Sequence, residues 1–190
     1  MNERSPEYTG EMSQGDSFTP PFEVGQLGRF TSELNGETDR GAALVAASRL
    51  DEILKNILAS FLRKAKSSDD LLEGFNAPLG TFSARASACH ALGLIQDNEF
   101  DEISKIRKVR NEFGHQWQGV NFDSERIRDL VDALPWGGPA EHEAAAPRRS
   151  RFTTAAVMLQ VDLMWRARLV ERERIKDRTW EHKARKAQQP

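Results

Sequence analysis

An arginine, an asparagine and a histidine stand close together in the stretch KIRKVRNEFGHQW, which covers residues 105–117. If this stretch is helical, Asn111 and His115 share one edge of the helix, because positions four apart differ by only about 40°. Arg110 lies beside them. A histidine can take or give a proton near neutral pH, whereas an arginine keeps its charge and can stabilise a phosphate. The three residues therefore form a candidate site for phosphoester chemistry.

A structural role is the alternative explanation of the same residues. Arg110 shares a helix stripe with Ile106 and Phe113, which are apolar, and a buried arginine nearly always has a partner. His115 can interact with carbonyl groups at the helix C-terminus, where a cation is favoured. The acids considered as counter-ions for Arg110 are Asp39, Asp51 and Glu52. Spacing alone favours this structural interpretation and leaves the catalytic one open.

Apolar residues recur at three- and four-residue steps in several segments, which is typical of helices that pack on a core. Thr38 or Asp39 is expected to cap the first strong helix, Thr81 the second, and Gly114 fits a left-handed terminus of the third. The expected helices span about 38–64, 81–94, 98–113, 123–134 and 152–186. No segment alternates as a strand would. The sequence predicts an all-α antiparallel bundle with a long C-terminal helix.

The composition divides the chain into four parts. Residues 1–24 are acidic, rich in Ser, Gly, Pro and Glu, and are expected to form a disordered tail. Residues 25–135 are expected to form the helical core domain, and residues 136–151 a linker rich in Pro, Gly and Ala. Residues 151–190 carry ten basic against five acidic residues, and residues 152–190 are expected to form a basic helix that frays at its end.

The chain carries no sign of a secreted or membrane protein. Its net charge is −2, and no run approaches the ~20 apolar residues that span a bilayer. The N-terminal stretch has no apolar h-region, so it is not expected to be a secretory signal. Cys89 is the only cysteine, so no intrachain disulfide can form and a cytoplasmic setting is expected. No cofactor is expected.

A metal site is not expected either. The four histidines lie in separate segments, and Cys89 has no companion at ligand spacing. Cys89 and His90 are adjacent, so their side chains would point about 100° apart on a helix. They are expected to be neighbours in the core rather than a nucleophile and its base. The histidines are His90, His115, His142 and His182.

The stretch ALGLIQDNEFDEISKIRKVR could form a helix-turn-helix, a motif that binds DNA directly. Its second helix uses Ile103, Ile106 and Val109 on a broad apolar face, which leaves only a narrow basic strip. DNA reading is therefore not expected. In the C-terminal helix, acids interleave with the cations, which is typical of a solvated, ion-paired helix rather than a nucleic-acid or membrane surface.

Three blocks, in order, resemble the mannitol operon repressor family. They read ETDRGAALVAASRLDEILKNIL, LLEGFNAPLGTFSARASACHALGLI and IRKVRNEFGH, and the similarity covers about residues 33–134. That family consists of all-helical bacterial cytoplasmic proteins and is named for a role in repressing mannitol uptake genes. The resemblance implies a transcriptional regulator that acts mainly through an unidentified protein partner.

The last block also resembles the signature of the HEPN superfamily of helical domains, which is an arginine, a polar residue, a short spacer and a histidine. Arg110, Asn111 and His115 match it. Many HEPN proteins are metal-independent ribonucleases that place the arginine and histidine of two subunits across a dimer cleft, and others keep the fold without activity. The resemblance implies a homodimer, and it makes a toxin- or defence-type ribonuclease acting on RNA the alternative function.

Overall fold

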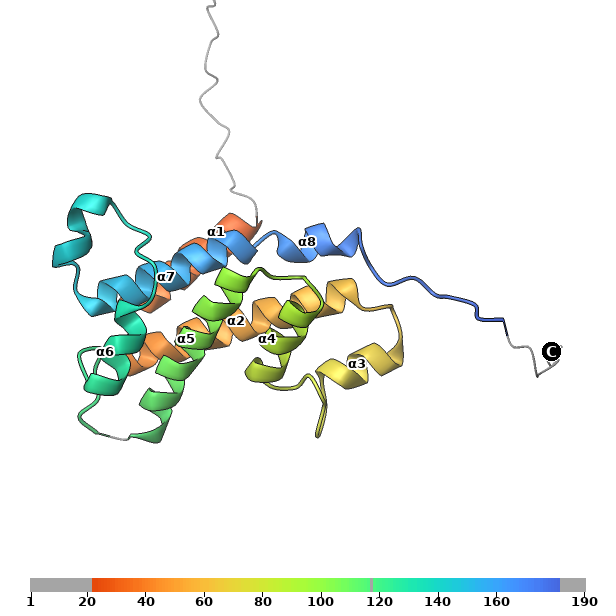
Figure 1. Ribbon diagram of the computed structural model, residues 1–190, viewed down its shortest axis with the longest axis horizontal. Helices are drawn as coiled ribbons and strands as arrows, with labels where there is room; N and C mark the ends of the chain where they lie inside the picture. The colour runs from red at the N-terminus through yellow and green to blue at the C-terminus, as the bar shows by residue number, and fades with distance from the viewer. Residues whose placement is uncertain (1–21, 117, 182–190) are drawn as a thin grey trace, which may run out of the picture.

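Every regular element of the computed structural model, which describes residues 22–116 and 118–181, is a helix (Figure 1). The predicted all-α class is confirmed. The elements are α1 (Phe22–Gly36), α2 (Asp39–Phe61), α3 (Lys66–Leu72), α4 (Phe82–Ala91), α5 (Asp97–His115), α6 (Glu125–Asp132), the 3-10 helix η1 (Ala140–Ala145), α7 (Arg148–Leu163) and α8 (Arg166–Glu171).

The long helix α2 forms the centre of the bundle and contacts α1, α3, α4, α5, α7 and α8. Its apolar residues at three- and four-residue steps, such as Leu50, Leu54 and Ile57, are fully buried. The predicted N-cap at Thr38 is present, since its hydroxyl oxygen accepts a hydrogen bond from Gly41 N at 3.1 Å. Neighbouring helices cover α2 along most of its length. Its buried alanines are small, which allows those helices to pack closely against it.

Helices α4 and α5 cross α2 and are joined by a tight turn at Gly93, whose φ is +69° (Figure 1). Thr81 caps α4 as predicted, because its hydroxyl oxygen accepts from Ala84 N at 3.2 Å. Gln96 is the N-cap of α5 and forms a capping box with Glu99, whose Oε2 accepts from Gln96 N at 2.7 Å. One face of α5 is buried in the core, namely Ile103, Ile106, Val109 and Phe113.

A row of three phenylalanines connects α5 to the C-terminal half of the chain. The ring centroids of Phe113 and Phe122 are 5.3 Å apart in an edge-to-face arrangement, and those of Phe122 and Phe152 are 4.8 Å apart. Aromatic pairs at these separations stabilise a core beyond their buried area. Phe152 lies in α7, so α7 and the core helices share one hydrophobic core.

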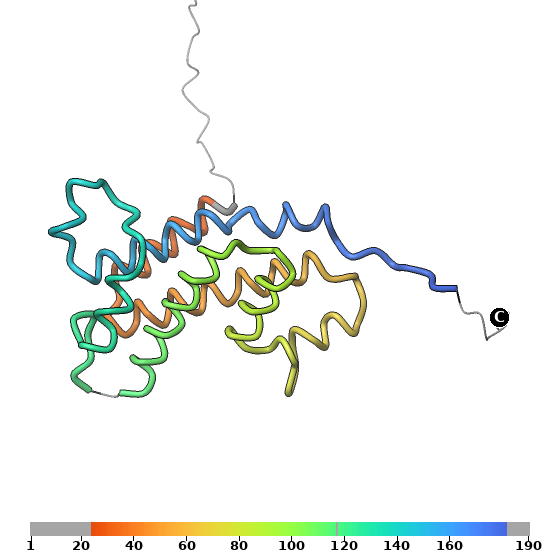
Figure 2. Tube along the Cα trace, viewed as in Figure 1, coloured from red at the N-terminus to blue at the C-terminus, as the bar shows by residue number. Residues whose placement is uncertain are grey.

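Helix α1 begins at Phe22, inside the segment assigned to the tail, and the tail residues 1–21 lie outside the described residues. α1 packs beside α7 (Figures 1 and 2). Arg149 of α7 fixes the junction between α1 and α2: it pairs with Asp39 at 2.7 Å and donates to the carbonyl oxygen of Leu34 at 3.1 Å. The bundle therefore extends beyond the predicted core domain, to α8.

The prediction of one helix over 152–186 is wrong in its extent. The helix starts earlier, breaks after Leu163, resumes as α8, and residues 172–181 are not helical (Figure 2). Arg174 donates to the carbonyl oxygens of Ala59 at 3.0 Å and Leu62 at 2.6 Å, and Ile175 N donates to Phe61 O at 2.9 Å. These bonds satisfy carbonyl groups at the end of α2, which a continued C-terminal helix could not reach.

One half-buried carboxylate, that of Glu102, makes the stability depend on pH. Partial burial, and then the negative charge of Asp162, raise the pKa of Glu102 in the folded chain. The folded state therefore binds this proton more tightly than the unfolded state, and stability falls as the pH rises from the ordinary glutamate range through the raised pKa. We expect Glu102→Gln to stabilise the protein at pH 7 by about 0.2–1 kcal/mol.

Urea unfolding at pH 7 and at acid pH checks this expectation. The gain should disappear below the ordinary glutamate range, where both states are protonated. Glu141→Gln, at an exposed position of η1, is the control and should change little at either pH. A gain that is the same at both pH values would contradict the assignment.

Candidate functional site

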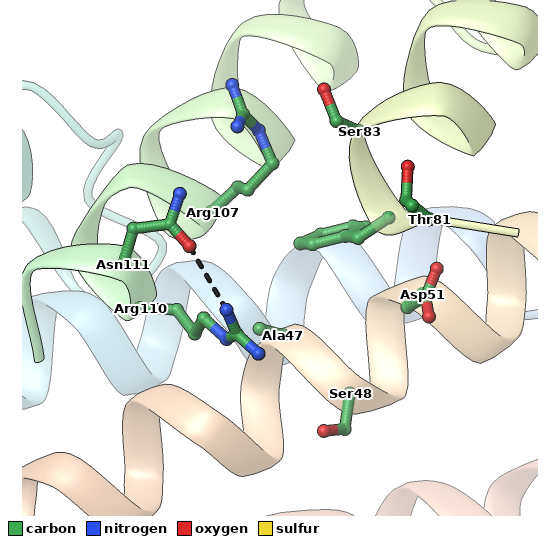
Figure 3. Close-up of a pocket in the computed structure, with 9 residues that line it drawn as sticks. Ala47, Ser48, Asp51, Thr81, Ser83, Arg107, Arg110 and Asn111 are labelled. Carbon is green, nitrogen blue, oxygen red and sulfur yellow. Dashed lines mark hydrogen bonds between the residues drawn. The ribbon is translucent and has the colours of Figure 1, made fainter. Parts of the chain in front are cut away.

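A pocket of about 310 Å³ opens between α2, the start of α4 and the second half of α5 (Figure 3). We call it the basic pocket. Its lining combines two guanidinium groups and several hydroxyl groups with the apolar side chains of Ala47 and Phe82. The lining residues are Ala47, Ser48, Asp51, Thr81, Phe82, Ser83, Arg107, Arg110 and Asn111.

Helix α5 supplies the cationic wall of the basic pocket. Arg107, Arg110 and Asn111 occupy positions three and four apart, so they share one helix face. Arg110 Nη1 donates to Asn111 Oδ1 at 3.2 Å (Figure 3). Arg110 is exposed rather than part of the core stripe, and neither arginine forms an ion pair with any residue in the described ranges. Arg110 and Asn111, predicted as site residues, therefore do lie together at an open site.

The three acids expected to balance Arg110 pair with other arginines instead. Asp39 pairs with Arg149, Asp51 with Arg85 and Glu52 with Arg49, each at 2.7 Å. Each acid is held by an arginine that lies closer to it, and this is true even of Asp51, which lines the basic pocket together with Arg110. Arg110 therefore keeps an uncompensated charge at the pocket.

His115 is exposed at the last position of α5 and does not line the basic pocket. Gly114 lies inside the helix and has no positive φ, so the predicted left-handed terminus is wrong. The cause is Arg40, which donates to the carbonyl oxygens of Phe113 at 2.6 Å and Gln116 at 2.5 Å. A side chain from α2 thus caps α5, and no glycine turn is needed to satisfy those carbonyls.

Arg85 supports the floor of the basic pocket. It is 8% exposed, pairs with Asp51, and donates to the carbonyl oxygens of Leu79 at 2.9 Å and Leu72 at 3.0 Å. These bonds fix the loop that leads into Thr81 at the start of α4. The sequence did not indicate Arg85, because two of its partners, Asp51 and Leu72, lie 34 and 13 positions away along the chain. Arg107 was not predicted as a site residue either. Arg107 and Arg110 are three positions apart, a separation that places them on the same face of a helix.

Cys89 and His90 do not form a catalytic pair. Burial raises the pKa of the Cys89 thiol to about 12, so it is not a nucleophilic thiolate near neutral pH. His90 stacks on Phe100 at 4.3 Å between ring centroids, and its Nε2 lies 2.8 Å from Asp97 Oδ1. Cys89 therefore lies in the core as expected, whereas His90 is half-buried and contacts the exposed Asp97, so the expectation of two core neighbours is met by Cys89 alone.

Two features of the described residues concern metal binding and membrane insertion. No group of three or more His, Cys, Asp or Glu side chains among them could hold a metal ion. His182, one of the histidines considered, lies outside these residues. No helix in the described part of the chain is both long and apolar enough to cross a bilayer.

Comparison with known proteins gives one solved structure. No protein-family model matches the chain, and no curated protein matches it. The chain is similar to a chain in the X-ray structure of the MtlR–HPr complex from Escherichia coli, with 24% sequence identity and a TM-score of 0.49, over 76% of this chain and 98% of that chain. At this identity and score, the similarity implies nothing about function.

Proposed function

We propose that this chain is a transcriptional regulator that acts through a protein partner rather than by reading DNA. The resemblance of residues 33–134 to the mannitol operon repressor family supports the class of function. The observation that favours a protein partner is the position of α5, the helix that would have to enter the major groove. Four helices, α2, α4, α6 and α7, contact it, and its apolar face is buried. A recognition helix needs a free face for base edges, whereas the open face of α5 borders the basic pocket and is flanked by residues of α2 and α4.

A groove between α1 and α2 supports protein binding. We call it the α1–α2 groove; its volume is about 530 Å³. Its apolar residues include Leu44, which is 40% exposed, and its charged residues are two arginines and two glutamates. That balance gives no net attraction for a phosphate backbone, on which nucleic-acid affinity depends. The lining residues are Gln26, Arg29, Phe30, Glu33, Leu44, Val45, Ser48, Arg49 and Glu52.

A reporter for the host's mannitol uptake genes tests the proposal. Leu44→Asp places a charge in the α1–α2 groove and should relieve repression, while the protein keeps its helical circular dichroism spectrum. Leu92→Asp is the matched control, since Leu92 is 44% exposed and lies outside the groove. HPr, named in the complex above, is a first probe for direct binding by titration calorimetry. Sequence-specific binding of the purified chain to operator DNA would contradict the proposal.

A HEPN-type ribonuclease is the second candidate function. The observation that favours it is that Arg110 is exposed at a pocket and has no acid partner among the described residues. His115 lies outside that pocket, so this function requires a homodimer in which a second subunit completes the site. Both functions are proposed for a homodimer.

Cleavage of RNA by the purified protein in the presence of a metal chelator tests this candidate. Arg110→Ala and His115→Ala should each abolish cleavage without changing the fold. Lys108→Ala, an exposed cation of α5 outside the basic pocket, should leave it intact. A wild-type protein that cleaves no RNA as a homodimer would exclude the ribonuclease.

A further inference from the structure

The charges around the basic pocket do not cancel. Its one acid, Asp51, is already paired with the buried Arg85 at 2.7 Å. The guanidinium groups of Arg107 and Arg110 therefore leave two positive charges at the pocket. Uncompensated arginines that converge on a concave surface favour an anionic ligand, because the partly enclosed surroundings screen the charges less than open water does.

Hydrogen-bond donors other than the arginines surround the same space. The hydroxyl group of Ser83 on α4 faces Arg107 on α5 across the opening, and Arg110 extends toward Ser48 on α2 (Figure 3). Thr81 Oγ1 accepts from Ala84 N, so its hydroxyl hydrogen remains as a donor. The first turn of α4 borders the pocket, and the N–H groups of a first turn have no acceptor within their own helix.

We propose that the basic pocket binds the phosphate group of a small phosphate monoester. The planar donor fork of an arginine matches the oxygens of a phosphate, and two arginines balance the near-double negative charge of a monoester at pH 7. The hydroxyl groups of Thr81 and Ser83 can donate to the remaining oxygens. A cavity of about 310 Å³ is at the lower end of the range for small-molecule sites, so it admits a phosphate and a compact organic remainder.

This inference goes beyond the proposed function, since binding needs neither a partner protein nor DNA. It also differs from the ribonuclease, because the pocket is complete within one chain and His115 has no part in it. A polynucleotide would need a track of several cations. On α5 beside the pocket, Lys105 is already ion-paired with Asp101, which leaves Lys108 as an exposed cation. A single compact anion fits these charges better.

Phosphorus NMR titration of the full chain tests the proposal, with inorganic phosphate, glycerol 3-phosphate and glucose 6-phosphate as probes. We expect saturable binding with a Kd of about 1 mM or lower, and tighter binding of one ester than of inorganic phosphate. Arg107→Ala and Arg110→Ala should each weaken binding about tenfold or more, as the loss of a charge-assisted hydrogen bond does. Both side chains reach solvent, so the variants should fold, and circular dichroism checks this.

Matched variants separate a site from general attraction. Lys108→Ala removes an equal charge from the same helix outside the pocket and should leave the Kd unchanged, and Ser83→Ala should weaken binding without changing any charge. The proposal fails if no probe saturates at about 10 mM, or if Lys108→Ala weakens binding as much as Arg107→Ala. It also fails if inorganic phosphate binds as tightly as both esters, or if a short RNA displaces the esters at far lower concentration.

Discussion

Arg85→Ala should lower the free energy of unfolding by about 3–5 kcal/mol, the usual effect of removing one partner of a buried ion pair. Arg85 donates to Asp51, Leu79 O and Leu72 O. Its removal leaves a partly buried carboxylate whose Oδ1 already has no hydrogen-bond partner, and it leaves both carbonyl oxygens unpaired. Urea unfolding followed by circular dichroism measures the loss.

Two further variants make this prediction specific. Arg85→Met combined with Asp51→Leu removes both charges and should recover much of the loss, because an apolar pair of similar volume can replace a buried ion pair. Arg128→Ala breaks an exposed pair with Asp129 and should cost less than about 1 kcal/mol. A similar cost for Arg85→Ala and Arg128→Ala would show that Arg85 does not hold the loop.

Glu99→Ala should have an effect of the same size, about 3–5 kcal/mol. Glu99 is 3% exposed and accepts from Arg166 Nη2 at 2.6 Å, from Arg166 Nη1 at 3.1 Å and from Gln96 N at 2.7 Å. It therefore caps α5 and attaches the start of α8 to the bundle. Its removal leaves the Arg166 guanidinium half-buried without its acid and leaves the Gln96 N–H without its acceptor.

A double-mutant cycle on Glu99 and Arg166 measures this contact separately from the packing around it. We expect a coupling free energy well above that of an exposed pair, which is about 0.2–1 kcal/mol. Hydrogen exchange gives a local readout, since Arg166→Ala should speed exchange in α8 more than in α2. A coupling free energy near zero would mean that the two side chains contribute independently.

The helices that carry continuous apolar stripes could be predicted from the sequence. In α2 the stripe through Leu50 and Leu54 and the cap at Thr38 determine the element locally, and the structure agrees with both. The N-cap at Thr81 was likewise predicted from the local sequence, and the structure agrees. In contrast, α1 was not predicted as a helix, because its glycines interrupt the pattern and its buried residues, Phe30 and Leu34, are few.

Long-range contacts explain what the sequence could not supply. The end of the C-terminal helix depends on bonds from Arg174 to carbonyl groups more than a hundred positions earlier. The end of α5 depends on Arg40, again from a distant segment. At the candidate site, the local signature identified Arg110 and Asn111. Which arginine each acid pairs with depends on how the helices pack. Asp39, Asp51 and Glu52 therefore pair with other arginines and not with Arg110.

The segment between α6 and α7 is largely exposed, while the helices on either side of it share one core. Phe152, Leu159 and Leu163 of α7 are buried within the bundle. A protease cut near residues 140–145 should therefore yield a nicked protein whose two fragments stay associated. Fragments produced as separate chains should reassemble when mixed, which would make this bundle a split-protein reporter whose joining point lies outside the lining of the basic pocket.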